Sequence, residues 1–163
     1  MLRYQLDALQ RHGRLADRFP PLLAQATHGD YQATNVLFDD ADRVVGVLDF
    51  DNVQLRPRVV EVSRTLALDF LPSDRLLPEA DAFLAGYHDT GRLTEHEALV
   101  LAPLRLYLSC TGTWPVTARY EDPNYQPRWD RFIREPSNWW EEHADELTER
   151  LLSLCHRTAT TEP

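Results

Sequence analysis

Residues 28–51 read HGDYQATNVLFDDADRVVGVLDFD, and this stretch decides the fold. It contains two short apolar runs, Asn35–Phe38 and Arg43–Phe50, which are rich in β-branched residues and are separated by the polar sequence DDAD. Such a pattern predicts a β-hairpin. Turn formation alone explains the acidic residues of DDAD, because aspartate side chains favour turns. It does not explain the polar residues on either side of the hairpin.

Three of these polar residues, Asp30, Asn35 and Asp49, are spaced so that the hairpin would bring them together. In the register that the DDAD turn predicts, Asn35 lies opposite Gly46, and the second strand carries Asp49 back to the loop that contains Asp30. Neighbouring strands lie about 4.8 Å apart, so the three side chains would meet. Mg²⁺ accepts carboxylate and amide oxygens, and phosphoryl transfer needs such ligands together with a carboxylate beside the attacking hydroxyl. The spacing therefore predicts a metal–phosphate site.

The motif HGDxxxxN at residues 28–35, followed by the hairpin and by LDFD at residues 48–51, resembles a known pair of loops. These are the catalytic and metal-binding loops of the aminoglycoside phosphotransferase and choline kinase group, which includes homoserine-kinase-like enzymes. At one remove they are similar to the HRDxxxxN and DFG elements of protein kinases. The resemblance implies a kinase that uses ATP and Mg²⁺ to phosphorylate a hydroxyl of a small molecule, such as an aminoglycoside, an amino alcohol or homoserine.

The resemblance also implies a role for each matching residue. Asp30 would be the catalytic base or would orient the attacking hydroxyl, and His28 would brace its loop. Asn35 and Asp49 would bind Mg²⁺ and, through it, the phosphates of ATP. Leu37 would form the floor beneath adenine.

Two further carboxylates belong to the same comparison. Asp51, the last residue of LDFD, would be an additional metal group. Members of the family commonly carry an aspartate after a proline that follows the hairpin, where it braces the catalytic loop. Here Pro57 is followed by Glu61, whose side chain is one methylene longer.

The rest of the chain reads as helices that combine an apolar stripe with start or stop signals. The signals are Gly13 after a helix over Leu2–Arg11, Pro57 before the second helix, Pro78 and Gly91 around the third, the capping-box pair Thr94 and Glu97 before the fourth, and an apolar face of Trp140, Ala144, Leu147, Leu151 and Leu154 on the last. The expected fold is α+β and mainly α. With the resemblance, it is the helical C-terminal lobe of a protein-kinase-like phosphotransferase, with one β-hairpin that carries the metal site. We expect residues 1–163 to form a single domain, with the two loops at 27–51 and a helical subdomain at 57–156.

Kinase-like enzymes bind ATP between two lobes, and the smaller lobe supplies a glycine-rich loop and a lysine. This chain has no lysine, its six glycines are isolated, and only residues 1–27 precede the HGD motif. We therefore expect the ATP-binding lobe to be absent. Three explanations stay open: a truncated chain, a lobe supplied by another polypeptide, or a role other than catalysis. An uncovered apolar surface would favour self-association, because monomers rarely expose large apolar patches.

The composition of the chain limits the classes of molecule that it is expected to bind. A formal net charge of -9 argues against nucleic-acid binding, because phosphate backbones are held by clustered basic residues. The negative charge suits a cationic acceptor, although solubility alone also explains it. The sequence has no signal-peptide pattern and no apolar run long enough to span a membrane, which predicts a cytoplasmic protein. Cys110 and Cys155 are expected to be reduced and packed.

The acceptor would be held by residues that follow the metal-binding loop. Aromatic and acidic side chains suit a cationic amine, although the aromatic rings can equally fill the core and the acidic groups can form a solvated helix face. The candidates are Trp114, Tyr120, Tyr125, Trp129, Trp139, Glu141, Glu142 and Asp145. A second hypothesis is a binding or oligomerisation module that derives from the same fold and has no catalytic role.

Overall fold

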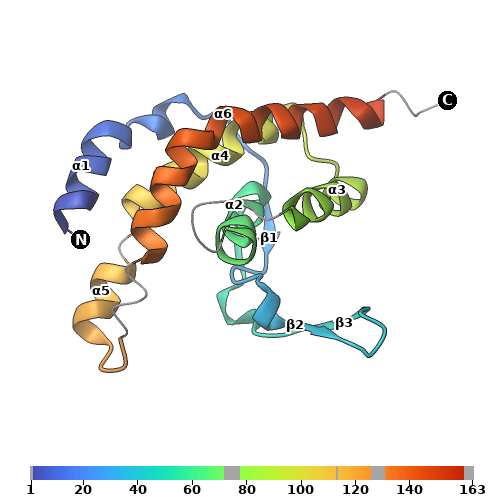
Figure 1. Ribbon diagram of the computed structural model, residues 1–163, viewed down its shortest axis with the longest axis horizontal. Coiled ribbons are helices and arrows are strands. Elements are labelled where there is room, and N and C mark those ends of the chain that lie inside the picture. Colours follow the sequence, from blue (N-terminus) through green and yellow to red (C-terminus); the bar gives the residue numbers. More distant parts are fainter. Residues whose placement is uncertain (1, 72–77, 113, 126–130, 160–163) are drawn as a thin grey trace.

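The computed structural model describes residues 2–71, 78–112, 114–125 and 131–159. Its elements follow the chain in the order α1 (Leu2–His12), β1 (Ala24–Thr27), β2 (Val36–Phe38), β3 (Val44–Val47), β4 (Gln54–Pro57), α2 (Arg58–Thr65), α3 (Glu79–Gly91), α4 (Glu95–Thr111), α5 (Trp114–Glu121) and α6 (Arg131–Ala159). The described chain is mainly helical with two small antiparallel sheets (Figure 1). The predicted class, α+β and mainly α, is confirmed.

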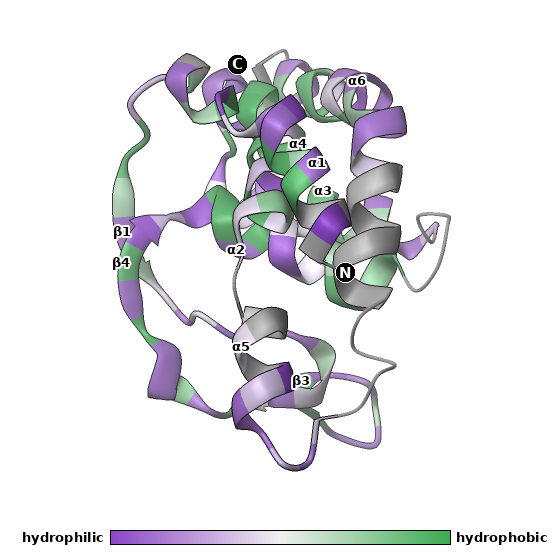
Figure 2. Cartoon of the chain, turned by 90° about the vertical axis from the view of Figure 1, so that its left-hand side faces the viewer, coloured by the Kyte–Doolittle hydropathy of each residue, from purple (hydrophilic) through white to green (hydrophobic). Residues whose placement is uncertain are grey.

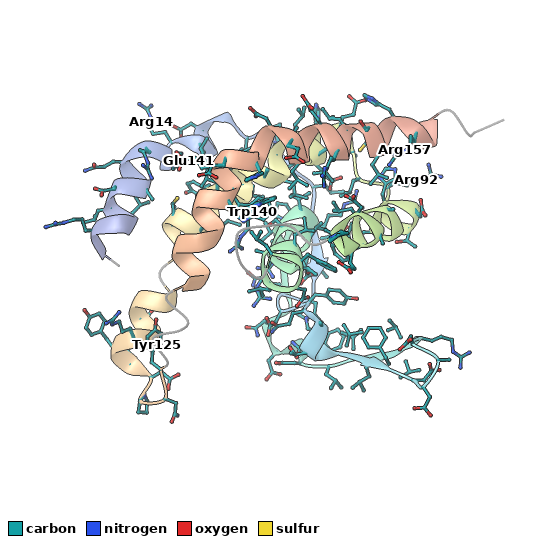
Figure 3. All side chains as sticks on the ribbon, viewed as in Figure 1. Arg14, Arg92, Tyr125, Trp140, Glu141 and Arg157 are labelled. Carbon is teal, nitrogen blue, oxygen red and sulfur yellow. The ribbon has the colours of Figure 1, made fainter. Side chains whose placement is uncertain are left out.

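The core lies between the long helices α4 and α6, with α1 and α2 packed beside them (Figure 1). Apolar ribbon segments gather where α4 and α2 approach each other (Figure 2). The predicted apolar face of α6 is confirmed: Trp140, Leu147 and Leu151 are at most 2% exposed, and Leu154 is 8% exposed. The next residue after Trp140 is Glu141 (Figure 3), whose carboxylate lies 3.7 Å from Arg11 and 3.3 Å from His12 at the end of α1. Helix α6 thus supplies side chains to the core and also a polar contact with α1.

A capping box starts α4, as the sequence predicts. The Thr94 hydroxyl accepts a hydrogen bond from the Glu97 amide, and the Glu97 carboxylate accepts one from the Thr94 amide at 2.8 Å. The same carboxylate accepts two hydrogen bonds from Arg58, the first residue of α2, both at 2.7 Å. Burial alone would raise the pKa of Glu97, but the hydrogen bonds from Arg58 and Thr94 outweigh burial and lower it. This ion pair fixes the start of α2 against α4.

The predicted hairpin is confirmed as β2 paired with β3, but its predicted register is wrong. Leu37, and not Asn35, lies opposite Gly46, and the pairing then shifts so that Phe38 faces Val44. Val45 is the extra residue of a bulge, and the hairpin is closed by a hydrogen bond of 3.0 Å between the Asp39 amide and the Arg43 carbonyl. A bulge of this kind adds one residue to one strand and changes the facing pairs.

A second sheet was not predicted. Strands β1 and β4 pair in antiparallel fashion, from Ala24 opposite Pro57 to Thr27 opposite Gln54, and the two ribbons run side by side in Figure 2. Their sequences, AQAT and QLRP, are short and contain no apolar β-branched or aromatic residue of the kind that marks a strand. The pair matters for the site because the HGD motif follows β1 directly and the segment after LDFD leads into β4.

No helix in the described part of the chain has the length and apolar character needed to cross a membrane.

Candidate functional site

The HGD loop (residues 28–35) and the LDFD loop (residues 48–51) are joined at Gly29. This glycine has a φ of 87°, and a Cβ atom on it would lie 2.0 Å from the carbonyl oxygen of Asn52. Only glycine combines a left-handed backbone with such a close approach. The backbones at the ends of the two loops are therefore in direct contact.

His28 makes a second connection between the two loops. Its Nδ1 accepts a hydrogen bond from the Asp30 amide at 3.2 Å, so the ring proton is on Nε2, which donates to the Leu48 carbonyl at 2.7 Å. The ring is buried and lies 4.5 Å from the Phe50 ring, measured between centroids. These contacts hold the residue before Asp49 against the loop that carries Asp30.

Asp30 and Asn35 are in contact. The Asn35 Nδ2 donates to the Asp30 carbonyl at 2.9 Å and to its Oδ2 at 3.3 Å. Because the amide nitrogen is engaged in this way, the amide oxygen of Asn35 is left to accept a cation. The Asp30 carboxylate also accepts hydrogen bonds from Gln32 at 3.2 Å and forms an ion pair with Nη2 of Arg64 on α2.

Asp49 lies close to Asn35 along the chain of backbone contacts, but its side chain makes fewer contacts than those of Asp30 and Asn35. The Leu48 amide donates to the Asn35 carbonyl at 2.8 Å. Asp49 is therefore the next residue after the one that pairs with Asn35. Asp49 adopts a left-handed conformation with a φ of 63°, and its side chain and that of Asp51 are exposed. Within the described ranges neither carboxylate makes a hydrogen bond or an ion pair, and no three His, Cys, Asp or Glu side chains are arranged to bind a metal. A shared ion for Asp30, Asn35 and Asp49 stays a prediction.

Leu37 lies on β2 opposite Gly46 and is 44% exposed. An exposed apolar side chain at this place is compatible with a contact to a flat ring, but the structure does not test that role. Leu37 therefore also stays a prediction as a nucleotide-binding residue.

Glu61 braces the HGD loop from α2. Its Oε2 accepts a hydrogen bond from the His28 amide at 2.9 Å, and its Oε1 accepts one from the Gly29 amide at 2.5 Å. Arg56 lies 3.9 Å from the same carboxylate. One turn further along the helix, the Thr65 hydroxyl donates to the Tyr31 carbonyl at 2.8 Å. The longer glutamate thus reaches both backbone amides.

Sequence reasoning singled out Glu61 but missed the other residues of α2 and its extension that hold the HGD loop in place. Arg64 binds Asp30, and Asp69, in the π-helical turn Leu66–Phe70 that continues α2, accepts a hydrogen bond from the Ala33 amide at 2.9 Å. Burial raises the pKa of Asp69, while the Ala33 amide and Arg64 oppose that shift. Glu61, Arg64 and Thr65 lie within four positions of one another, which is the spacing of neighbours on one helix surface. That spacing from Glu61 was the feature of the sequence that could have identified Arg64 and Thr65.

The sequence profile of the Phosphotransferase enzyme family matches residues 2–99, which is more than half of the chain. The chain belongs to this family. The match includes both loops, all four strands and helices α1 to α3 of the phosphotransferase chain. A comparison with curated proteins gave no match.

The acceptor candidates of this phosphotransferase chain differ in their exposure. Trp139 is 7% exposed and belongs to the core, so the core interpretation applies to it. Tyr120 on α5 is 75% exposed, and Trp129 lies outside the described residues. The backbone of Trp114 starts α5, Tyr125 is half-buried, and Glu141, Glu142 and Asp145 are exposed on α6.

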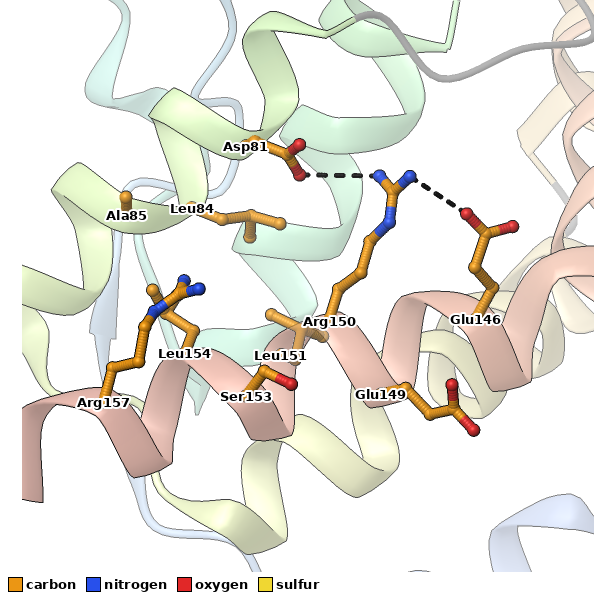
Figure 4. A pocket seen from close by; sticks show the side chains of 10 residues that line it. All are labelled: Asp81, Leu84, Ala85, Glu146, Glu149, Arg150, Leu151, Ser153, Leu154 and Arg157. Atoms are coloured by element: carbon orange, nitrogen blue, oxygen red, sulfur yellow. Dashed lines mark hydrogen bonds and ion pairs between the residues drawn. The ribbon is translucent and has the colours of Figure 1, made fainter.

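Two cavities lie on either side of α3. The first, of about 440 Å³, is lined by Tyr31 of the HGD loop and by residues of α2 and α3 that include Phe83 and Tyr87. The second, of about 710 Å³, lies between α3 and α6 (Figure 4) and contains none of the predicted site residues. In it Arg150 is paired with Asp81 at 3.5 Å and Glu146 at 2.9 Å. Only the first adjoins the candidate site.

Proposed function

We propose that this chain carries the catalytic and metal-binding residues of an ATP- and Mg²⁺-dependent kinase that phosphorylates a hydroxyl of a small molecule. Its helices would be the C-terminal lobe of a kinase-like fold, and the reaction would take place in the cytoplasm. The observation that supports the proposal most is the contact between Asp30 and Asn35, with Leu48 hydrogen-bonded to both His28 and Asn35. The two loops that phosphoryl transfer requires are thus connected.

Asp30 would accept a hydrogen bond from the acceptor hydroxyl and hold its oxygen ready for attack. Arg64 and Asn35 fix the Asp30 carboxylate from two directions, so that it needs little reorganisation. The amide oxygen of Asn35 and the free carboxylates of Asp49 and Asp51 are oxygen donors of the kind that Mg²⁺ prefers. Once bound, Mg²⁺ would neutralise charge on the phosphates of ATP.

The surface around the hairpin supports the expectation that another polypeptide covers it. Many of its large apolar side chains are exposed, from 44% to 84%. These are Leu23, Leu37, Phe38, Val44, Val45, Leu48, Phe50, Val53 and Leu55. An apolar surface of this extent usually marks an interaction site. A second copy of the chain or a nucleotide-binding lobe would cover it, which is also what the alternative function, an oligomerisation module, requires.

Isothermal titration of the chain with ATP and MgCl₂ separates the two functions. A kinase predicts saturable heat at micromolar nucleotide that disappears when EDTA removes the metal. An absence of heat at millimolar nucleotide, together with a stable dimer in light scattering, would favour the oligomerisation module.

The Asp30→Asn variant tests the catalytic residue. We expect it to abolish phosphoryl transfer from radiolabelled ATP, with nucleotide affinity within about twofold of the wild type, because an amide cannot accept the hydroxyl proton. Asp40→Asn, in the exposed hairpin turn, is the matched control and should remain active. Full transfer by the Asp30→Asn variant would exclude Asp30 as the base.

A further inference from the structure

Arg64 and Arg105 are two arginines whose guanidinium groups are incompletely paired. Arg64 forms its ion pair with Asp30 through Nη2, but its Nη1 is buried and has no hydrogen-bond partner. Arg105, on the neighbouring helix α4, is partly buried, and its Nε also lacks a partner. In the part of the chain that the structure describes, no carboxylate forms an ion pair with Arg105. Arg64 thus has an unpartnered donor atom beside Asp30, and Arg105 has another on the neighbouring helix α4.

The two arginines are held near each other by the packing of α2 on α4. Both helices start at the ion pair between Arg58 and Glu97. At 1.5 Å per residue, Arg64 lies about 9 Å along α2 from this ion pair and Arg105 about 12 Å along α4. Burial, with a contribution from the charge of Arg64, lowers the pKa of Arg105 to about 10. Arg105 is thus still charged at neutral pH.

This arrangement is unfavourable as it stands. Arg64 has Asp30 as a partner, but Arg105 is partly buried and has no partner among the described carboxylates. Such a charge destabilises the folded state, and a like charge close to it adds to the effect. A water molecule can satisfy an unpaired N–H group, but it does not neutralise the charge. A carboxylate or a phosphate does both, because guanidinium groups bind either one through two parallel hydrogen bonds. An anion is the ligand that this pair lacks.

We propose that Arg64 and Arg105 bind an anionic group, a carboxylate or a phosphate, of the molecule whose hydroxyl Asp30 orients. The inference rests on the proposed kinase function. Arg64 contacts Asp30 and belongs to the anion site, so both ends of a short hydroxy acid lie within reach of one side chain. Among the acceptors considered, this favours a hydroxy acid such as homoserine over an aminoglycoside or a simple amino alcohol. The net charge of -9 does not oppose it, because distant surface charges are screened.

Binding of three compounds with the same four-carbon chain tests the charge preference. The probes are 4-hydroxybutyrate, 1,4-butanediol and 4-amino-1-butanol, each titrated into the chain by isothermal titration at low ionic strength, with inorganic phosphate as a fourth probe. We expect 4-hydroxybutyrate and phosphate to bind at least about tenfold more tightly than the diol and the amine, since a charged hydrogen bond contributes at least this much. Equal or tighter binding of the amine would overturn the proposal.

The Arg105→Met variant locates the anion. It should weaken binding of 4-hydroxybutyrate and phosphate by about 10- to 100-fold, while Arg14→Gln, at a site whose side chain is 95% exposed, should leave it unchanged. The melting temperature of the ligand-free variant separates a binding role from a structural one. Loss of an unpaired buried charge should leave the melting temperature unchanged or raise it. A fall of more than about 3 °C, or unchanged phosphate affinity, would contradict the inference.

A further titration tests whether the two arginines bind the acceptor or the phosphates of ATP. The 4-hydroxybutyrate titration is repeated with saturating Mg²⁺ and a non-hydrolysable ATP analogue. Simultaneous binding supports an acceptor site, whereas competition would assign the arginines to the nucleotide phosphates and overturn the acceptor assignment. If the analogue does not bind at all, the kinase proposal and its acceptor both fail, and the first two arms still decide whether an anion site exists.

Discussion

Glu61 offers the sharpest test of how the HGD loop is held. In the Glu61→Gln variant, one carboxylate oxygen becomes an NH₂ group, which cannot accept a hydrogen bond from either backbone amide. The side chain is only 16% exposed, so water replaces the lost acceptor poorly. One charge-assisted hydrogen bond contributes about 1.5–3 kcal/mol, and loss of charge weakens the remaining one by about 1 kcal/mol. We therefore expect the loop to be destabilised by about 2.5–4 kcal/mol.

Amide hydrogen exchange measured by NMR reports this loss at the two donors, His28 and Gly29. At about 1.4 kcal/mol per factor of ten, their exchange should accelerate by roughly 60- to 700-fold. Glu61→Asp should give a smaller effect than Glu61→Gln. Its side chain is shorter by about 1.5 Å and cannot reach both amides, but it keeps the negative charge and can still accept a hydrogen bond from one of them. Glu149→Gln, at an exposed position of α6, is the control. Unchanged protection of His28 and Gly29 in the Glu61→Gln variant would refute the bracing role.

Three further predictions concern packing and charge. With Arg58 present, the pKa of Glu97 is lowered below its usual 4.5, so its stabilising contribution is complete above pH 4.5 and is lost as the pH falls through the lowered value. Arg58→Gln should remove about 3 kcal/mol at neutral pH and make stability depend less on acidic pH, because only the hydrogen bonds from Thr94 then oppose the effect of burial on the pKa of Glu97. Urea unfolding at several pH values measures both effects. Leu151→Ala should lower the free energy of unfolding by about 2–5 kcal/mol, since Leu151 is 1% exposed. Gly29→Ala should destabilise the chain by more than about 2 kcal/mol, whereas Gly86→Ala, where an added Cβ meets no atom within 4 Å, should stabilise it by about 0.4–1 kcal/mol, as thermal unfolding will show.

The helices illustrate what local patterns predict well. The capping box at Thr94 and the apolar face of α6 were read from the sequence and are present in the structure. Both depend on residues three or four positions apart, and such residues are neighbours on any helix. The hairpin was predicted for a similar reason, because its two strands are separated by a short turn. Its register was wrong by two residues, because the turn is one residue longer than predicted and the bulge at Val45 adds another, and neither leaves a clear mark in the sequence.

The candidate site was only partly accessible to sequence reasoning. The spacing of Asp30 and Asn35 marked both residues, and the structure places them in contact. The partners that hold them come from elsewhere in the chain. Arg64 is 34 positions from Asp30, and Arg105 lies on yet another helix. Because no local rule links these segments, their proximity appears only when α2 packs on α4.

The sequence by itself therefore determined the helices, the hairpin and the identity of the HGD and LDFD motifs, because each depends on the chemistry of residues close together in the chain. The tertiary structure alone decided which other groups surround these motifs: the β1–β4 pair, Arg64 beside Asp30, and Asp69 at the Ala33 amide. It also showed that the Glu61 carboxylate reaches two amides of the HGD loop. Contacts of this kind depend on how buried apolar faces pack, and many sequence positions contribute to that packing at once.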